Sequence, residues 1–449
     1  MKKAVENMDT STGKKIYNLA DRLFPITRSI TGKGVRETLE IINNEIKDTG
    51  YQLTIHEIPT GTPVFDWTVP KEWVIREAYI ENEKHEKIID FKENNLHVLG
   101  YSTPVDEWVE LDELLEHVYT QEDMPDAIPY VTSYYKERFG FCMSENTKKS
   151  LKKNTKYHMY IDSELIEGSL TIGELIIPAT EEVFFDDGGE DKKEILISTY
   201  TCHPSMANNE CSGPSLSAYL IKYVAALPKR RYSYRFVFNP ETIGSITYLS
   251  QNLEELKKNI AAGFVLSCVG DNRDYSFIPS RYSDTLADRV IENVLKFKEK
   301  YTKYSFLDRG SDERQYCSPG VDLPVIGFCR SKYAKYPEYH TSKDDMTLVS
   351  EEGFQGSYEA MCEVINALEY NKNYKTKVLC EPQLGKRGLY PTISKKGSYD
   401  SILAMRDLIA YADGRNDLIA ISEYINVPVK ELIPIVDKLM ANDLFESVD

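Results

Sequence analysis

The sequence contains no run of apolar residues that approaches the ~20 needed to cross a membrane as a helix. Residues 1–28 lack the apolar core of a secretory signal peptide, so we expect a cytoplasmic protein with no membrane partner. Basic residues are also in deficit, because 54 Lys and Arg face 71 Asp and Glu and give a formal net charge of −17. This balance is unfavourable for a general nucleic-acid binder, whose phosphate contacts require a basic surface.

Several motifs that define common sites are missing as well. No two of the eight cysteines have Cys-x-x-Cys spacing, which excludes a zinc ribbon and a thioredoxin-type site and leaves reduced thiols as the expectation. There is no G-x-S-x-G elbow, no G-x-x-x-x-G-K-[ST] loop and no G-x-G-x-x-G after a predicted strand. Cys202 and Cys211 flank His203, so a Cys–His nucleophile is conceivable, but we expect these two thiols to pack as small hydrophobic groups.

With 449 residues, the chain is long enough for two to four domains. Residues 1–50 predict two helices, and residues 51–174 alternate short strand-like segments with turn residues. From 175 to 378, apolar strands alternate with helices, which is typical of an open, mostly parallel α/β sheet. We therefore predict one discontinuous α/β domain (1–50 and 175–378) and an inserted β-rich domain (51–174) that forms a lid or wall of its cleft.

The last part of the chain, 379–449, predicts a winged helix-turn-helix, with helices at 417–425 and 429–441. The second of these helices has two lysines offset by two acidic residues and is interrupted by Pro434. It lacks the Arg and Asn side chains that usually read bases. We therefore expect this domain to mediate protein contact, including possible homo-oligomerisation, and not to bind DNA.

Candidate site residues follow the predicted strands, where open α/β sheets bind their ligands. His203 directly follows the strand 194–202, and Glu210 lies seven residues later, just before a helix. One strand-loop-helix corner would bring together an imidazole and a carboxylate, both of which are suitable zinc ligands. The alternative is structural, with His203 bonded to the strand end and Glu210 facing the positive end of the helix. The polar run of Asn208 and Asn209 beside Glu210 makes the two interpretations equally supported.

Two further residues extend this candidate site. Glu241 follows the second predicted strand, where a carboxylate near a metal can act as a general base, or else compensate the charge of a helix N-terminus. His340 lies in a polar loop, and of the seven histidines only His203 and His340 fall in the predicted α/β domain. Two histidines and one acid with an open fourth position have the stoichiometry of a catalytic zinc site. We predict one zinc ion on His203, Glu210 and His340.

Five short motifs in combination carry a resemblance. Thr-Cys-His-Pro-Ser, Asn-Asn-Glu-Cys-Ser-Gly, Pro-Glu-Thr-Ile-Gly-Ser, Gly-Ser-Asp-Glu-Arg-Gln and Tyr-His-Thr-Ser-Lys-Asp resemble zinc aminopeptidases of the bacterial leucyl aminopeptidase and glutamate carboxypeptidase type. More closely, the whole chain resembles a bacterial family of uncharacterised aminopeptidase-like proteins with an inserted β-domain and a C-terminal winged helix, often linked to surface-polysaccharide gene clusters. The resemblance implies an α/β fold with a mixed, mostly parallel sheet of the zinc-aminopeptidase (phosphorylase/hydrolase-like) type.

The resemblance also implies roles for single residues. His203 matches the first metal-binding histidine of the wider group, His340 matches the last, and Glu241 matches the catalytic general base. Thr242 stands where the wider group has a second, metal-binding Glu, and Ser267 stands where it has a metal-binding Asp.

A third acidic ligand of the wider group also lacks its counterpart. The bridging Asp aligns on or beside Asn209, which leaves Glu210 as the nearest carboxylate. The loss of acidic ligands favours one metal ion over two.

By this resemblance, the chain is expected to be a zinc metallohydrolase that cleaves an amide bond next to a free amine in a small peptide or an aminoacylated small molecule. Asp312, Glu313 and Arg314 would line the cleft and contact the substrate, and Arg28 and Arg36 would reach the same cleft. Each of these residues could instead be a solvated loop charge. The alternative function is a non-peptidase zinc protein of the same fold that performs acyl transfer or cyclisation, or binds a ligand without turnover.

Overall fold

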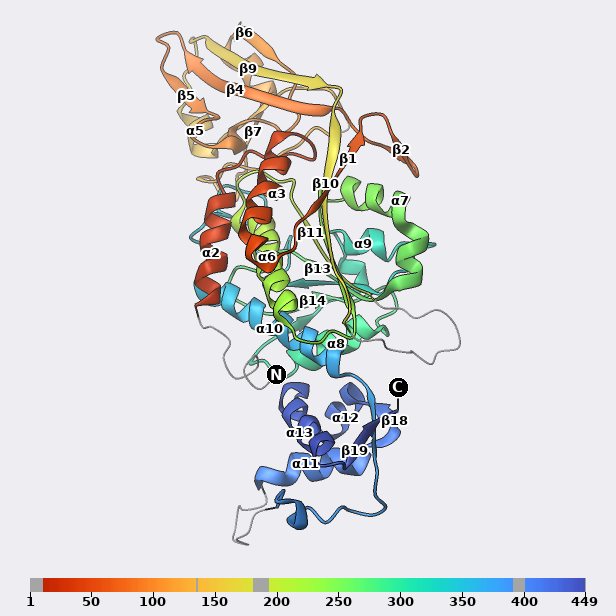
Figure 1. Ribbon diagram of the computed structural model, residues 1–449. Helices are drawn as coiled ribbons and strands as arrows, with labels where there is room; N and C mark the ends of the chain where they lie inside the picture. Colours follow the sequence, from red (N-terminus) through yellow and green to blue (C-terminus); the bar gives the residue numbers. More distant parts are fainter. Residues whose placement is uncertain (1–10, 135, 181–193, 391–399, 449) are drawn as a thin grey trace.

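Figure 1 shows the computed structural model of the chain, which describes residues 11–134, 136–180, 194–390 and 400–448. The first ten residues of the predicted segment 1–50 lie outside these ranges. A long sheet with helices on both sides occupies the middle of Figure 1, a smaller β-rich part lies above it, and the C-terminal helices lie below it. The molecule is thus an α/β body with one part appended at each end.

The central sheet joins eight strands of the described chain in the order β1-β10-β12-β11-β13-β16-β14-β15. In that order the strands span Thr54–Pro59, Ser169–Ile177, Ser233–Asn239, Glu194–Tyr200, Ile260–Leu266, Val325–Cys329, Ser276–Ile278 and Thr302–Lys303. The middle strands β12, β11, β13 and β16 are parallel, and β10 and β14 flank them in the antiparallel sense. The predicted α/β class with a mixed, mostly parallel sheet is confirmed.

Helices cover both faces of this sheet, because the middle strands present apolar side chains alternately to each face. Ile195 and Ile197 of β11 belong to one core and Leu196 to the other. The first face carries α2 (Thr12–Leu23), α3 (Lys33–Ile46), α6 (Ser212–Ala226), α8 (Leu286–Leu295) and α10 (Glu351–Tyr370). The second face carries α7 (Ile243–Asn259) and α9 (Glu313–Tyr316).

The β-rich part is built on a separate antiparallel sheet in the order β5-β4-β9-β6. These strands span Lys87–Asp90, Glu72–Asn82, Tyr157–Ile166 and Val105–Val109. Shorter elements complete this part: β2 (Pro63–Val64), β3 (Trp67–Thr68), α4 (Leu111–Glu116), β7 (Val118–Tyr119), β8 (Phe141–Cys142) and α5 (Glu145–Ser150). The predicted insert 51–174 also contains β1 and most of β10, which the structure places in the central sheet. Their polar–apolar alternation suits a half-buried strand of either sheet, so composition alone could not assign them.

The C-terminal part combines β17 (Asn373–Thr376), α11 (Asp400–Tyr411), β18 (Asp413–Asp417), α12 (Leu418–Ile425), α13 (Val429–Ala441) and β19 (Phe445–Ser447). Helix α13, the second helix of the predicted helix-turn-helix, faces the α/β body through polar contacts with α10. The Lys430 ammonium lies 3.3 Å from the Glu363 carboxylate, and the Tyr370 hydroxyl donates a hydrogen bond to Asp437 at 3.1 Å. No helix in the described part of the chain is long and apolar enough to cross a bilayer.

The order of the parallel strands determines where a site can form. The chain runs from β11 to β12 on one side and then returns past β11 to β13 on its other side. Connections that leave a strand in opposite directions open a crevice at the carboxyl ends of the strands, and ligands of open α/β sheets bind there. The loops after β11 and β12 carry His203 and Glu241 at this edge.

Candidate metal centre

The loop after β11 brings His203 and Glu210 together as the sequence predicts. After β11, residues Ala207–Cys211 form one wide helical turn that leads directly into α6. This turn returns Glu210 to the strand end, where its Oε2 lies 2.8 Å from Nδ1 of His203. Both side chains are buried. The contact fixes the imidazole so that its other nitrogen, Nε2, is directed away from Glu210.

Glu241 approaches that second nitrogen from the loop after β12. Its Oε2 lies 3.6 Å from His203 Nε2, and its backbone N–H donates to Cys202 Sγ at 3.2 Å. Burial, followed by the nearby Asp312 carboxylate, raises the pKa of Glu241 to about 8. Burial likewise raises the pKa of Glu210 to about 8. A buried carboxyl group and a half-buried one, both with pKa values near neutrality next to one histidine, are typical of a functional site.

His340 joins the site from the loop before α10. Its ring centroid lies 5.3 Å from that of His203, and the Tyr339 ring stacks on it at 3.8 Å. Burial lowers the pKa of His340 well below its usual value, and burial lowers that of His203 to about 3. Both imidazoles are therefore neutral at physiological pH, which is the form that coordinates metals.

Tyr130 of the β-rich part closes the site, and the sequence offered no local signal for it. Its ring centroid lies 5.1 Å from those of both His203 and His340. Its backbone N–H donates to the His340 carbonyl at 2.8 Å, which ties the two loops together. The predicted wall of the cleft thus contributes a ring directly beside the histidines.

The residues present fit a metal ion. Ligand atoms of Cys202, His203 and Glu210 all lie within 4.8 Å of one another, and the predicted ligand His340 lies outside this group. Nε2 of His340 and Oε1 of Glu210 are buried without a hydrogen-bond partner in the described chain, although buried polar atoms almost always have one. Nitrogen, oxygen and sulfur donors in this combination suit zinc. Cys202 and Cys211 are buried in hydrophobic cores, as expected for thiols that pack as small hydrophobic groups. Cys202 Sγ also lies 3.3 Å from His203 Nδ1.

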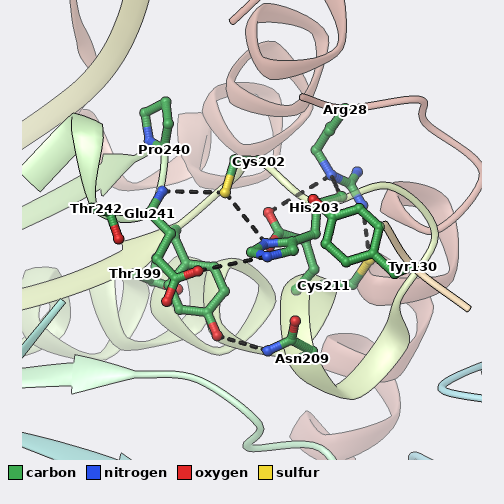
Figure 2. Close-up of polar contacts among 12 residues, drawn as sticks. Arg28, Tyr130, Thr199, Cys202, His203, Asn209, Cys211, Pro240, Glu241 and Thr242 are labelled. Carbon is green, nitrogen blue, oxygen red and sulfur yellow. Dashed lines mark hydrogen bonds and ion pairs between the residues drawn. The ribbon is translucent and has the colours of Figure 1, made fainter. Parts of the chain in front are cut away.

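Arg28 supports this corner from behind, on the side of His203 opposite Glu241 (Figure 2). Its Nε donates to the His203 carbonyl at 2.9 Å and lies 3.9 Å from Glu210 Oε1. Its terminal nitrogens donate to the Leu23 carbonyl at 2.7 Å and to Cys211 Sγ at 3.3 Å. The buried Arg28 guanidinium is directed at protein acceptors and thereby supports this loop, and the substrate contact of Arg28 stays a prediction.

Asp312, which was predicted to line the cleft, likewise holds a loop in place through buried hydrogen bonds. Asp312 is fully buried and accepts hydrogen bonds from the Asn239 amide at 3.0 Å, the Thr242 backbone N–H at 2.7 Å and the Ser245 hydroxyl at 2.8 Å. These bonds hold the Glu241–Thr242 turn, where Thr242 has the unusual φ of +64°. In sequence, a carboxylate that holds a turn looks the same as a solvated loop charge.

Glu313 and Arg314 differ in their access to the site. One Glu313 oxygen accepts from the backbone N–H groups of Gly310 at 2.9 Å and Ser311 at 3.1 Å and from the Tyr333 hydroxyl. Arg314 donates to Thr242 Oγ1 at 2.5 Å, and its charge opposes the rise of the Glu241 pKa. Of the predicted substrate residues, Arg314 is the one whose charge lowers the pKa of Glu241, whereas Asp312 and Glu313 raise it. Arg36, which was also expected to reach the cleft, instead pairs with Glu72 at 2.5 Å.

The metal-free protein is expected to lose stability as the pH rises from 6.5 to about 8. Glu210 and Glu241 ionise near 4.5 when unfolded but near 8 when folded, so their contribution falls with rising pH until about 8. Asp344, raised to about 7, adds to this trend. The lowered pKa values of the two histidines act in the opposite direction only below 6.5. Thermal unfolding after chelation measures the slope, which should flatten in Glu210→Gln; an unchanged slope in that variant would contradict the assignment.

The fold and this constellation define an aminopeptidase-like α/β protein with a histidine–carboxylate centre at the carboxyl ends of its strands. Residues 17–371 match the family described as a domain of unknown function, DUF4910, and residues 372–447 match a winged helix-turn-helix family. The chain belongs to the DUF4910 family, and the predicted C-terminal winged helix is confirmed.

Known relatives share this architecture. A Clostridium acetobutylicum protein whose name refers to polysaccharide biosynthesis and an aminopeptidase-like domain is 44% identical over 449 residues, 99% of each chain. A crystal structure from the same organism has a TM-score of 0.89 at 43% identity and covers 100% of this chain and 99% of that one. BSAP, a zinc aminopeptidase from Bacillus subtilis, has a TM-score of 0.56 at 11% identity over 80% of this chain and 94% of its own. The likeness to BSAP establishes the fold alone. The 44% identical relative, whose name includes an aminopeptidase-like domain, confirms the predicted family resemblance.

Proposed function

We propose that the chain is a zinc-dependent hydrolase that cleaves an amide bond next to a free amine. The observation that carries the proposal is the approach of Glu241 Oε2 to within 3.6 Å of His203 Nε2, with the His340 ring 5.3 Å from the same imidazole. In this proposal His203, Glu210 and His340 hold one zinc ion. Bound zinc would supply Lewis-acid polarisation of the scissile carbonyl.

The protein's own residues then have separable roles. Glu241 takes a proton from the attacking water and returns it to the leaving amine, for which a pKa of about 8 is suited because the group exchanges protons near neutral pH. Arg314, beside Glu241, orients a polar group of the substrate. The half-buried Tyr130 ring over both histidines shields the site from bulk water, which strengthens the electrostatic interactions inside it.

The substrate class follows from the same chemistry and from the relative. We place the substrate among small peptides and aminoacylated small molecules, in polysaccharide metabolism in the cytoplasm. The polysaccharide assignment depends on the name of the Clostridium acetobutylicum protein that is 44% identical to this chain.

A panel of aminoacyl anilides, dipeptides and aminoacylated amino sugars, incubated with zinc-loaded protein, tests the proposal. Hydrolysis of any member that requires a free α-amine would support it, because acetylation of that amine should abolish turnover. If the zinc-loaded protein hydrolyses no member of the panel, the proposal is contradicted. That result would favour a zinc protein that transfers an acyl group or binds a ligand without turnover.

Purified protein is expected to contain about one zinc ion per chain, the occupancy of a three-ligand catalytic site. His340→Ala should lose most of this zinc, because it removes a buried nitrogen that has no partner in the described chain. His117→Ala is the matched control, since His117 stacks on Phe139 in the β-rich part at 4.2 Å. Metal analysis by mass spectrometry measures both variants, and equal zinc in His340→Ala and wild type would refute the ligand assignment.

A further inference from the structure

A segment of the β-rich part, residues 124–134, lies across a loop of the α/β body beside the candidate metal centre and is called the strap below. Both ends of the strap are bonded within the β-rich part. The Pro125 carbonyl accepts from the Asn146 backbone N–H at 3.1 Å, and the Val131 carbonyl accepts from the Gly100 N–H at 2.9 Å. The strap is therefore held at both ends by one part of the molecule, while its middle contacts the other.

The middle of the strap pairs with the loop that carries His340, residues 339–343, as two antiparallel strands would. Pro129 and Thr341 form an antiparallel bridge. Hydrogen bonds join the two segments on either side of this bridge: from the Tyr130 N–H to the His340 carbonyl at 2.8 Å, from the Ser342 N–H to the Ile128 carbonyl at 2.9 Å, and from the Ile128 N–H to Ser342 Oγ at 3.0 Å.

The His340 loop depends on the strap for its position. In the described chain, the hydrogen bonds of residues 339–343 to any distant segment go to the strap alone, and the others are local turn bonds. The fixed points lie outside the loop, where Glu338 pairs with Arg273 at 2.9 Å and Asp344 accepts from the Asn208 N–H at 2.6 Å. Between these two points, the strap is the hydrogen-bonded support of the loop.

The backbone of His340 needs such a support. Its φ is +56°, in the left-handed region that a residue with a side chain adopts at a cost in free energy. A conformation of this kind persists where the surrounding structure enforces it. The bond from the Tyr130 N–H holds the His340 carbonyl, and the Tyr130 ring lies 5.1 Å from the His340 imidazole. One residue of the strap thus contacts both the backbone and the side chain of His340.

The other histidine of the centre is held without the strap. Glu210 accepts at 2.8 Å from Nδ1 of His203, and Arg28 donates to the His203 carbonyl at 2.9 Å. The Tyr339 ring that stacks on His340 belongs to the same loop and moves with it. The strap therefore acts on one of the two histidines, and it does so from a part of the chain that lies outside the α/β body.

We propose that the strap is a positioning element of the metal centre, with Ile128 and Tyr130 holding His340 in place beside His203. The centre is complete only when the β-rich part is docked on the α/β body, so this part acts on metal affinity as well as on the shape of the cleft. That His340 binds zinc rests on the proposed function, whereas the hold of the strap on the His340 loop does not.

Hydrogen exchange of the metal-free, full-length protein tests this hold directly. In Tyr130→Ala, the amides of residues 339–343 should exchange at least about tenfold faster than in wild type, because exchange follows local opening of the loop. Residues 207–211 should keep their protection, and Tyr130→Phe, which keeps the ring, should behave as wild type. Tyr160→Ala is the matched control, because it removes a ring that stacks on Tyr79 at 4.9 Å in the outer sheet of the same part.

The consequence for the metal is measured on the same variants. Tyr130→Ala should raise the Kd for zinc about 10–100-fold, the usual effect of removing a residue that orients a ligand. It should also change the visible spectrum of the cobalt-substituted protein, because a displaced histidine alters the coordination geometry. In the His340→Ala background the same substitution should have little further effect, since both changes act through one ligand.

Two results would overturn the proposal. One is wild-type exchange of residues 339–343 in Tyr130→Ala, and the other is an equal loss of zinc affinity with and without His340. If wild-type protein binds no zinc but Tyr130→Ala still exchanges faster in residues 339–343, the proposed function fails while the hold of the strap on the His340 loop is supported.

Discussion

Glu241→Gln is expected to lower kcat for amide hydrolysis by about 10²–10⁴-fold, the usual contribution of a general base. Glutamine keeps the size of the side chain, and the backbone N–H bond to Cys202 Sγ is unaffected by the change. The amide cannot take up a proton, so the carboxylate function 3.6 Å from His203 Nε2 is lost while the proposed zinc ligands stay in place. The measurement is kcat and zinc content of the same preparation, on the substrate that the panel identifies.

Glu254→Gln is the matched control for this experiment, because Glu254 is an exposed carboxylate on α7, the helix that follows Glu241. It should retain wild-type kcat. Full activity in Glu241→Gln would rule out the proposed base. Loss of both zinc and activity in Glu241→Gln would instead identify Glu241 as a metal ligand. A different residue would then have to act as the base.

The helices and the central strands could be predicted from local patterns because each is specified by its own sequence. The helices predicted at 417–425 and 429–441 match the observed α12 and α13, which span Leu418–Ile425 and Val429–Ala441. The pairing of His203 with Glu210 was accessible for the same reason, since one loop of a few residues joins them.

Contacts between distant segments could not be predicted in this way. Tyr130 reaches the histidines from the β-rich part, and no local pattern marks it as different from the other tyrosines. The structural roles of Asp312 and Arg28 depend on which backbone groups form hydrogen bonds with them after folding. A single sequence shows that a charge is present but does not show whether water or a buried N–H or C=O group will be its partner.

Arg28→Met is expected to lower the free energy of unfolding by about 2–6 kcal/mol, because leaving each of two buried carbonyl oxygens without a donor costs about 1–3 kcal/mol. Methionine fills much of the volume but donates no hydrogen bond. The carbonyls of Leu23 and His203 would lose their buried donor, and Glu210 would lose the Arg28 guanidinium that lies 3.9 Å from its Oε1. Urea unfolding of the metal-free protein, followed by circular dichroism, gives the change.

Arg22→Met provides the comparison, because Arg22 is exposed and pairs with Glu45 at 3.0 Å on the surface. An exposed pair contributes about 0–1 kcal/mol, so this variant should unfold close to wild type. The two roles considered for Arg28 have opposite signatures. If Arg28 contacts the substrate, Arg28→Met should raise KM and leave unfolding unchanged. If Arg28 holds the His203 loop, the same substitution should lower stability and zinc affinity together, because His203 and Glu210 keep their mutual geometry only while that loop is held.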